Sequence, residues 1–297
     1  MYLRSSILAT ACLGFVAPWA AAAPIPDLSF DASNPGTTPN DVWDDEQGTS
    51  FRWNLDDSAQ LVTVNDPSAP TVSHAYSSPA AVGTSDASTN AAIYQGTPLE
   101  NNEDVTLEFF ILPPNSPGSQ TIFETGGSNG AALYLRPRGT DFSGGVPDAD
   151  DDDRFQVAWR VNQGNIGATN TDEARSQLVQ ESQLGEWVHI TAVLDVDQGL
   201  TLYLDGVERA TYDFPAGETL TSWSGGNGAG LGTINSDAPQ FNFGDFEGEI
   251  AFARFYQEAL TSDDASELYQ QVIPEPGSFA FLGLGSMFML RRARRNG

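Results

Sequence analysis

Short segments in which apolar and polar residues alternate, separated by turns, constrain the fold of this chain more than any other sequence feature. In the clearest one, apolar side chains occupy every second position from Val105 to Ile111, and Pro113-Pro114 end the run. A period of two predicts a β-strand with one buried face. Comparable strands are predicted at residues 51–55, 59–64, 121–124, 131–135, 155–161, 187–194, 200–204, 207–210 and 249–256. Many short strands about ten residues apart predict an all-β sandwich or jelly roll.

Turn and cap residues refine this prediction. Asp-Gly at 205–206 between two apolar runs is a strong hairpin signal. Residues 67–90 are rich in Ser, Ala, Pro and Thr, which predicts a loop or a weakly patterned edge strand. Only residues 262–272 are predicted to form a helix, because Thr261 or Ser262 can cap it and two aspartates fill its first turn.

The charge balance excludes two classes of partner. The chain has 40 acidic and 13 basic residues, none of them lysine, and a formal net charge of −27. Such a surface repels nucleic acid and anionic lipid. An acidic shell without lysine suits a saline habitat, where salt screens the self-repulsion. Carboxylates also collect divalent cations such as calcium, and the two interpretations are compatible.

Residues 1–23 have the features of a secretory signal peptide. Arg4 supplies the positive charge, residues 7–16 form a short apolar run, and the alanines at 20–23 suit signal peptidase. The apolar run is shorter than the roughly 20 residues that cross a bilayer, so we predict cleavage rather than anchoring. The single cysteine, Cys12, leaves with the signal, which predicts a mature chain without a disulfide.

Residues 274–297 combine Pro274-Glu275-Pro276, an uncharged apolar stretch at 278–290 and a terminal arginine cluster. This order is a stop-transfer arrangement, in which the positive cluster stays cytoplasmic. The apolar stretch is short for a permanent span, so we predict a transient apolar anchor helix.

The tail closely resembles the PEP-CTERM sorting signal of Gram-negative bacteria that make exopolysaccharide. The resemblance implies that an exosortase recognises Pro274, Glu275 and Pro276 and removes the tail during delivery to the surface. We therefore expect an exported protein, processed by signal peptidase and exosortase. It would be anchored transiently in the inner membrane and then lie at the cell surface or in the extracellular matrix.

The middle of the chain carries a second resemblance. Its motifs, in order, are Gly-Glu-Trp-Val-His-Ile at 185–190, Leu-Tyr-Leu-Asp-Gly at 202–206, Phe-Glu-Gly-Glu-Ile-Ala-Phe-Ala-Arg-Phe-Tyr at 246–256 and Ala-Leu-Thr at 259–261. This order resembles the laminin G-like, concanavalin A-like jelly-roll family. The resemblance is clearest from residue 102, and it implies a jelly-roll domain over 27–272, because opening strands must complete both sheets. The acidic residue that the family usually has after the isoleucine of the last strand is here Ala251.

Asp245, Glu247 and Glu249 are spaced so that a single strand would place all three carboxylates on one face. Glycosidases of related folds hold an acid and a nucleophile about 5 Å apart, so a secreted polysaccharide hydrolase of the concanavalin A-like glucanase type is the alternative function. The run lacks the usual Glu-x-Asp-x-Glu order, and glycines at 244 and 248 favour a turn. We therefore assign no catalytic residue.

Six aspartates are candidate calcium ligands: Asp148, Asp150, Asp151, Asp152, Asp153 and Asp245. The first five lie between two predicted strands, and calcium takes several oxygen ligands from a flexible loop. Laminin G-like domains often bind calcium at a loop rim, so the resemblance supports this interpretation. A solvated acidic loop is the alternative.

Trp223 is the candidate ligand contact, because an exposed indole in its Gly-rich segment could stack on a sugar ring. Packing in the core is the equal alternative. His74 and His189 are the only histidines and lack metal-ligand spacing. His189 lies within an apolar strand, which favours a structural role.

These observations predict a binding or structural protein rather than an enzyme. The jelly roll would recognise a glycan such as exopolysaccharide, or a matrix component, through loops supported by calcium. A structural biofilm protein without a discrete ligand is a third interpretation.

Overall fold

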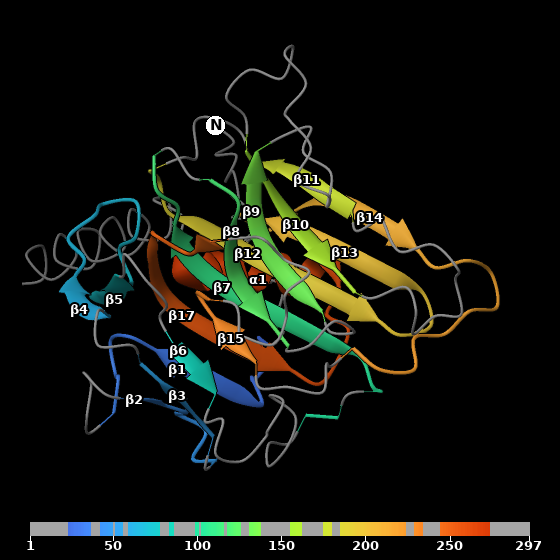
Figure 1. Ribbon diagram of the computed structural model, residues 1–297, viewed down its shortest axis with the longest axis horizontal. Coiled ribbons are helices and arrows are strands. Elements are labelled where there is room, and N and C mark those ends of the chain that lie inside the picture. The colour runs from blue at the N-terminus through green and yellow to red at the C-terminus, as the bar shows by residue number, and fades with distance from the viewer. Residues whose placement is uncertain are drawn as a thin grey trace, which may run out of the picture.

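The part of the chain that the structure describes folds as a β-sandwich with one helix (Figure 1). The computed structural model describes residues 23–36, 42–49, 51–55, 59–77, 83–85, 99–100, 102–115, 118–125, 131–137, 155–161, 175–179, 185–223, 229–233 and 244–273. The predicted signal peptide up to residue 22 and the predicted sorting and anchor tail, 274–297, lie outside these residues. Within them, no helix is long and apolar enough to cross a membrane.

Sheet 1 is antiparallel throughout and carries helix α1. Its strands are, in order, β14 (Val207–Asp213), β13 (Gly199–Leu204), β12 (Val188–Asp195), β7 (Val105–Leu112), β17 (Glu249–Tyr256), β5 (His74–Ser77) and β4 (Gln60–Thr63). Strand β1 (Leu28–Asp31) also pairs with β17, beyond the short stretch that β5 occupies. The first and last strands of the sandwich are therefore neighbours.

Sheet 2 packs against sheet 1. Its strands are, in order, β11 (Arg175–Val179), β10 (Phe155–Arg160), β9 (Ala132–Pro137), β8 (Gln120–Glu124), β15 (Gly230–Leu231), β6 (Gly83–Ser85), β3 (Arg52–Asn54) and β2 (Val42–Asp44). The short strand β16 (Gly244–Asp245) runs parallel to β8. The all-β prediction is confirmed.

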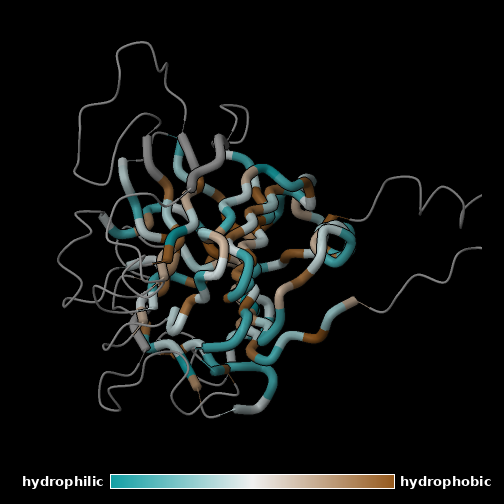
Figure 2. The backbone as a smooth tube through the Cα atoms, turned by 90° about the vertical axis from the view of Figure 1, so that its right-hand side faces the viewer, coloured by the Kyte–Doolittle hydropathy of each residue, from teal (hydrophilic) through white to brown (hydrophobic). Residues whose placement is uncertain are grey.

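The core lies between the two sheets and follows the period of two. In β7, Val105, Leu107, Phe109 and Ile111 belong to the main hydrophobic cluster, whereas Phe110 packs in a second cluster on the other face. Aromatic side chains from β1, β2, β3, β8 and β17 fill much of the main cluster with edge-on contacts. Figure 2 shows hydrophobic and hydrophilic stretches alternating along the backbone.

Helix α1 (Ser262–Val272) packs on the outer face of sheet 1. Thr261 is its N-cap: the hydroxyl accepts a hydrogen bond from the Asp264 amide, and the Asp264 carboxylate accepts one from the Thr261 amide. The buried Ala265 lies in a cluster with residues of β12 and β13. The helix prediction is thus confirmed, with Thr261 rather than Ser262 as the cap.

The predicted hairpin is present, and a predicted loop contains strands. Asp205 and Gly206 both have positive φ, 52° and 71°, as a two-residue hairpin turn requires. Residues 67–90, predicted as a loop or an edge strand, contain β5 and β6. Strand β5 pairs with β17 on one edge and with β4 on the other, and its Ala75 and Tyr76 are buried.

Candidate functional site

The three carboxylates whose spacing would fit one strand face do not share a strand, and Glu247 lies in the link between β16 and β17. Asp245 lies in β16 of sheet 2, and Glu249 lies in β17 of sheet 1. Between them the chain crosses the core at Phe246, which is fully buried. Gly248 permits the crossing, since a Cβ there would lie 2.2 Å from the Leu112 carbonyl oxygen. The glycines at 244 and 248 had favoured a turn over a single strand, and the chain does leave sheet 2 at this point before it enters β17.

Each of these carboxylates has its own surroundings. Asp245 accepts a hydrogen bond of 2.7 Å from the Thr233 hydroxyl. Glu247 exchanges two hydrogen bonds with the Gln120 amide, at 3.1 and 3.3 Å. Burial raises the pKa of Glu249 above its ordinary value. The arrangement gives no pair of carboxylates from one strand for glycosidase chemistry.

The metal prediction falls largely outside the part of the chain that the structure describes. Asp148 and residues 150–153 lie outside the described residues, and Asp245 is the only candidate ligand that the structure describes. Within the described segments, no group of three or more His, Cys, Asp or Glu side chains is arranged to hold a metal ion. Calcium binding stays a prediction.

Trp223 packs in the main core and is only 1% exposed. Its indole N–H donates a hydrogen bond of 3.0 Å to the Glu103 carbonyl oxygen. Its own carbonyl oxygen accepts hydrogen bonds from the Thr125 hydroxyl and the Ala131 amide. Of the two interpretations of Trp223, core packing is the one that this burial supports, because the ring has no exposed face for a sugar.

A buried polar cluster lies on the helix-covered face of sheet 1. Glu108 of β7 is fully buried, and its carboxylate accepts hydrogen bonds from His189 Nε2 of β12 at 2.8 Å and from the Tyr256 hydroxyl of β17 at 2.5 Å. Arg254 of β17 lies 3.5 Å from the same carboxylate and 3.8 Å from Asp31. The cluster links the three central strands of the sheet.

The cluster keeps Glu108 ionised. Burial by itself raises the pKa of the Glu108 carboxyl, but the hydrogen bond from His189 and the charge of Arg254 outweigh burial and hold it below its ordinary value. Burial, followed by the nearby negative charge of Glu108, raises the pKa of Tyr256, so this residue stays a neutral donor. Because Glu108 and His189 are both fully buried, the cluster connects neighbouring strands and offers no accessible chemistry. The structural role predicted for His189 agrees with this position.

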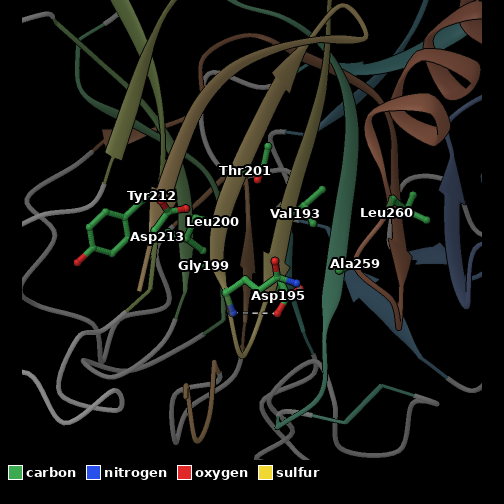
Figure 3. Close-up of a pocket in the computed structure, with 10 residues that line it drawn as sticks. Val193, Asp195, Gly199, Leu200, Thr201, Tyr212, Asp213, Ala259 and Leu260 are labelled. Atoms are coloured by element: carbon green, nitrogen blue, oxygen red, sulfur yellow. Dashed lines mark hydrogen bonds between the residues drawn. The ribbon is translucent and has the colours of Figure 1, made fainter. Parts of the chain in front are cut away.

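A pocket of about 200 Å³ lies at the β14 end of sheet 1 (Figure 3). We call it the β12–β14 pocket; its lining includes Val193, Asp195, Gln198, Thr201, Asp213 and Leu260. Asp195, Gly199 and Asp213 form one row across the three strands, since Asp195 is the register partner of Gly199 and Gly199 that of Asp213. The pocket thus has a carboxylate on each side of a glycine.

Neighbouring side chains give the pocket a mixed character. Val193 and Thr201 are register partners two residues along the same strands, so they share the face of the carboxylates. Leu260 adds an apolar wall and is 5% exposed. In Figure 3 the ring of Tyr212 points away from Asp195, and it packs edge-on against Phe214, toward the core. The arrangement suits a small ligand with both hydroxyl groups and apolar carbon atoms.

Comparison with known proteins identifies the family. Residues 83–266, more than half of the chain, match the family model described as the concanavalin A-like lectin/glucanases superfamily. The chain belongs to this superfamily. No curated protein sequence matches the chain significantly.

Solved structures agree with the superfamily fold. The binding domain of botulinum neurotoxin serotype D is 14% identical, with a TM-score of 0.50 over 83% of this chain and 50% of that one. The binding domain of Paraclostridial Mosquitocidal Protein 1 is 14% identical, with a TM-score of 0.50 over 83% and 52%. Domain 4 of an extracellular arabinanase from Geobacillus stearothermophilus, in complex with arabinotriose, is 16% identical, with a TM-score of 0.47 over 82% and 98%. The chain spans about half the length of the two toxin structures.

In this superfamily member, the pocket residues were not among the predicted site residues. The Asp195–Gly199 stretch was visible only as a turn between two strands, because Asp and Gly are common in turns. The second carboxylate, Asp213, lies on the next strand and joins the pocket through register alone. A row across three strands cannot be recognised from spacing along the chain.

Proposed function

We propose that this chain is an exported, surface-sorted protein whose jelly roll binds glycan without cleaving it. The observation that carries the proposal is the division of Asp245 and Glu249 between two sheets within a lectin/glucanase fold. A glycosidase needs two carboxylates on either side of one bond, whereas a lectin needs only polar groups in a pocket. The fold is that of the superfamily, and the site chemistry favours its lectin branch.

The export and sorting parts of the proposal rest on the two ends of the chain. Residues 1–23 would be removed by signal peptidase, and an exosortase would cleave at Pro274-Glu275-Pro276 after transient insertion of the tail in the inner membrane. The mature protein would then meet exopolysaccharide at the cell surface. Mass spectrometry of surface-extracted protein tests this step: a mature C-terminus near residue 274 is expected, and an intact arginine cluster would contradict it.

A glycan array tests the binding activity. We expect the full chain, purified in detergent, to bind a subset of neutral or exopolysaccharide-derived oligosaccharides, because carboxylates accept hydrogen bonds from sugar hydroxyls and protein hydroxyls both donate hydrogen bonds to them and accept hydrogen bonds from them. Parallel arrays in calcium and in chelator test whether binding depends on calcium ligands among residues 148–153. Binding to no glycan in either condition sinks the proposal.

Reducing-sugar release separates binding from hydrolysis. The wild-type chain, incubated with any oligosaccharide that it binds, is expected to release none. Release that Glu247→Gln or Glu249→Gln abolishes would instead establish the glucanase alternative. This comparison is informative because burial raises the pKa of Glu249, a property that a general acid also needs.

A further inference from the structure

We propose that the β12–β14 pocket is the ligand site and that it takes an uncharged sugar unit while rejecting anionic sugars such as uronates and sulfated sugars. This inference rests on the proposed glycan-binding function and adds its location and ligand class. Three observations support it: the pocket's volume, its row of two carboxylates and the absence of a basic side chain among the described residues that line it.

The row of Asp195, Gly199 and Asp213 sets the width of the site. Adjacent strands lie about 4.8 Å apart, so the two aspartate Cα atoms are separated by about 10 Å. No side chain stands between them, and none fits: a Cβ on Gly199 would lie 1.9 Å from the Tyr212 carbonyl oxygen, and its φ is 147°. The volume of about 200 Å³ is below the roughly 300–1,000 Å³ of pockets for drug-sized ligands, which limits the occupant to about one sugar unit.

The Asp195 carboxylate is held in place before any ligand arrives. Its Oδ1 accepts hydrogen bonds from the amides of Asp197 at 3.0 Å and Gln198 at 2.9 Å, and its Oδ2 accepts one from the Gln198 side-chain amide. The turn that carries Asp195 is itself held in place, because the Val196 amide donates a hydrogen bond of 2.9 Å to the Asp104 carboxylate. A fixed acceptor loses little conformational entropy on binding.

The polar side chains favour a ligand that donates hydrogen bonds. Carboxylates only accept, whereas sugar hydroxyls donate, so Asp195 and the exposed Asp213 can each hold a hydroxyl. The Thr201 hydroxyl adds one group that donates or accepts. Val193 and Leu260 also line the pocket, each of them 5% exposed.

The same side chains act against an anionic ligand. A uronate or sulfate in the pocket would face two carboxylates, and none of the lining residues in the described segments is an arginine or lysine that could offset their charge. Like charges placed next to each other weaken binding, so a site lined by carboxylates discriminates against anionic ligands. The formal net charge of −27 adds a long-range repulsion that salt weakens.

An array of matched pairs tests the inference. The full chain is applied to oligosaccharides printed as neutral and uronate forms of one backbone, such as β-1,4-mannan with β-1,4-polymannuronate and β-1,4-glucan with β-1,4-polyglucuronate. We expect binding to at least one neutral member and at least tenfold weaker binding to its uronate partner at 0.5 M NaCl. Equal or stronger binding to the uronate overturns the ligand class.

Pocket variants test the location. Asp213→Asn is expected to weaken neutral-sugar binding at least fivefold and to narrow the neutral-to-uronate ratio, because it removes one repelling charge. Thr201→Val is expected to weaken binding without changing that ratio. Glu208→Gln is the control, because it makes the same change of charge at the other, exposed end of β14. It should change neither the neutral-sugar affinity nor the neutral-to-uronate ratio. Glycan binding that survives both pocket variants overturns the location but leaves the proposed function standing, whereas binding to no glycan at all sinks both.

Discussion

At the scale of single residues, the Glu108 carboxylate shows how a fully buried charge is tolerated. It accepts a hydrogen bond from His189 and another from Tyr256, and it has an ionic contact with Arg254. These three contacts offset the free-energy cost of removing the charge from water. The three partners come from two other strands. A carboxylate at this position therefore holds the centre of sheet 1 in register.

Replacing Glu108 with Gln should destabilise the fold by about 3 kcal/mol near neutral pH. The reason is that the buried His189 and the neighbouring Arg254 would lose the negative charge that they contact. Urea unfolding measures the loss. Tyr256→Phe, which removes one hydrogen bond, should cost only about 1 kcal/mol. The folded-state pKa of Glu108 lies below the ordinary 4.5, so its contribution is present above that value and is lost as the pH falls through the folded pKa.

The difference in unfolding free energy between wild type and Glu108→Gln should thus shrink as the pH falls below 4.5. A difference that stays constant down to pH 3, or a variant as stable as wild type at pH 7, would contradict this account of the cluster.

At the scale of elements, helix α1 combines a local signal with a tertiary one. Its capping box at Thr261 and Asp264 is encoded within four residues, while its buried face depends on sheet 1. The turn at Asp205–Gly206 lies against this helix: a Cβ on Gly206 would come within 3.0 Å of the Tyr269 side chain. Turn and helix therefore position each other.

Thr261→Ala should lower the unfolding free energy by about 1 kcal/mol, since the Asp264 amide loses its side-chain acceptor. The urea midpoint measures it, and Thr261→Ser, which keeps the hydroxyl, should remain near wild type. An alanine variant as stable as the serine variant would show that packing alone sets the start of the helix.

At the scale of the whole molecule, charge dominates. A formal net charge of −27 on one chain makes self-repulsion a global term, and ionic strength controls its range. The Debye length falls from about 10 Å at 0.1 M salt to about 3 Å at 1 M. A saline setting therefore stabilises this molecule without any specific contact.

The thermal midpoint should rise between 0.1 and 1 M NaCl by several degrees, because screening reduces repulsion that unfolding would relieve. Scanning calorimetry in NaCl, with CaCl₂ at matched ionic strength alongside, separates screening from specific calcium binding. A further rise in millimolar CaCl₂ would support the predicted calcium ligands. A midpoint that falls with NaCl would contradict the screening argument.

The sequence by itself determined the local structure of this protein. The alternation from Val105 to Ile111, the Asp-Gly turn and the cap of α1 are all written within a few neighbouring residues, and all three are present. Motif order also indicated the superfamily that the family model matches. These signals predict the structure correctly because they depend on local backbone preferences and on the period of two, which neighbouring residues determine.

Only the tertiary structure decided which faces meet. The bond from Tyr256 to Glu108 joins residues 148 positions apart, and the pocket row depends on the register of three strands. A period of two says that one face is buried but not against which strand. For that reason the spacing of Asp245 and Glu249 left open whether they share a strand face, and the structure places them on two sheets with the buried Phe246 between them.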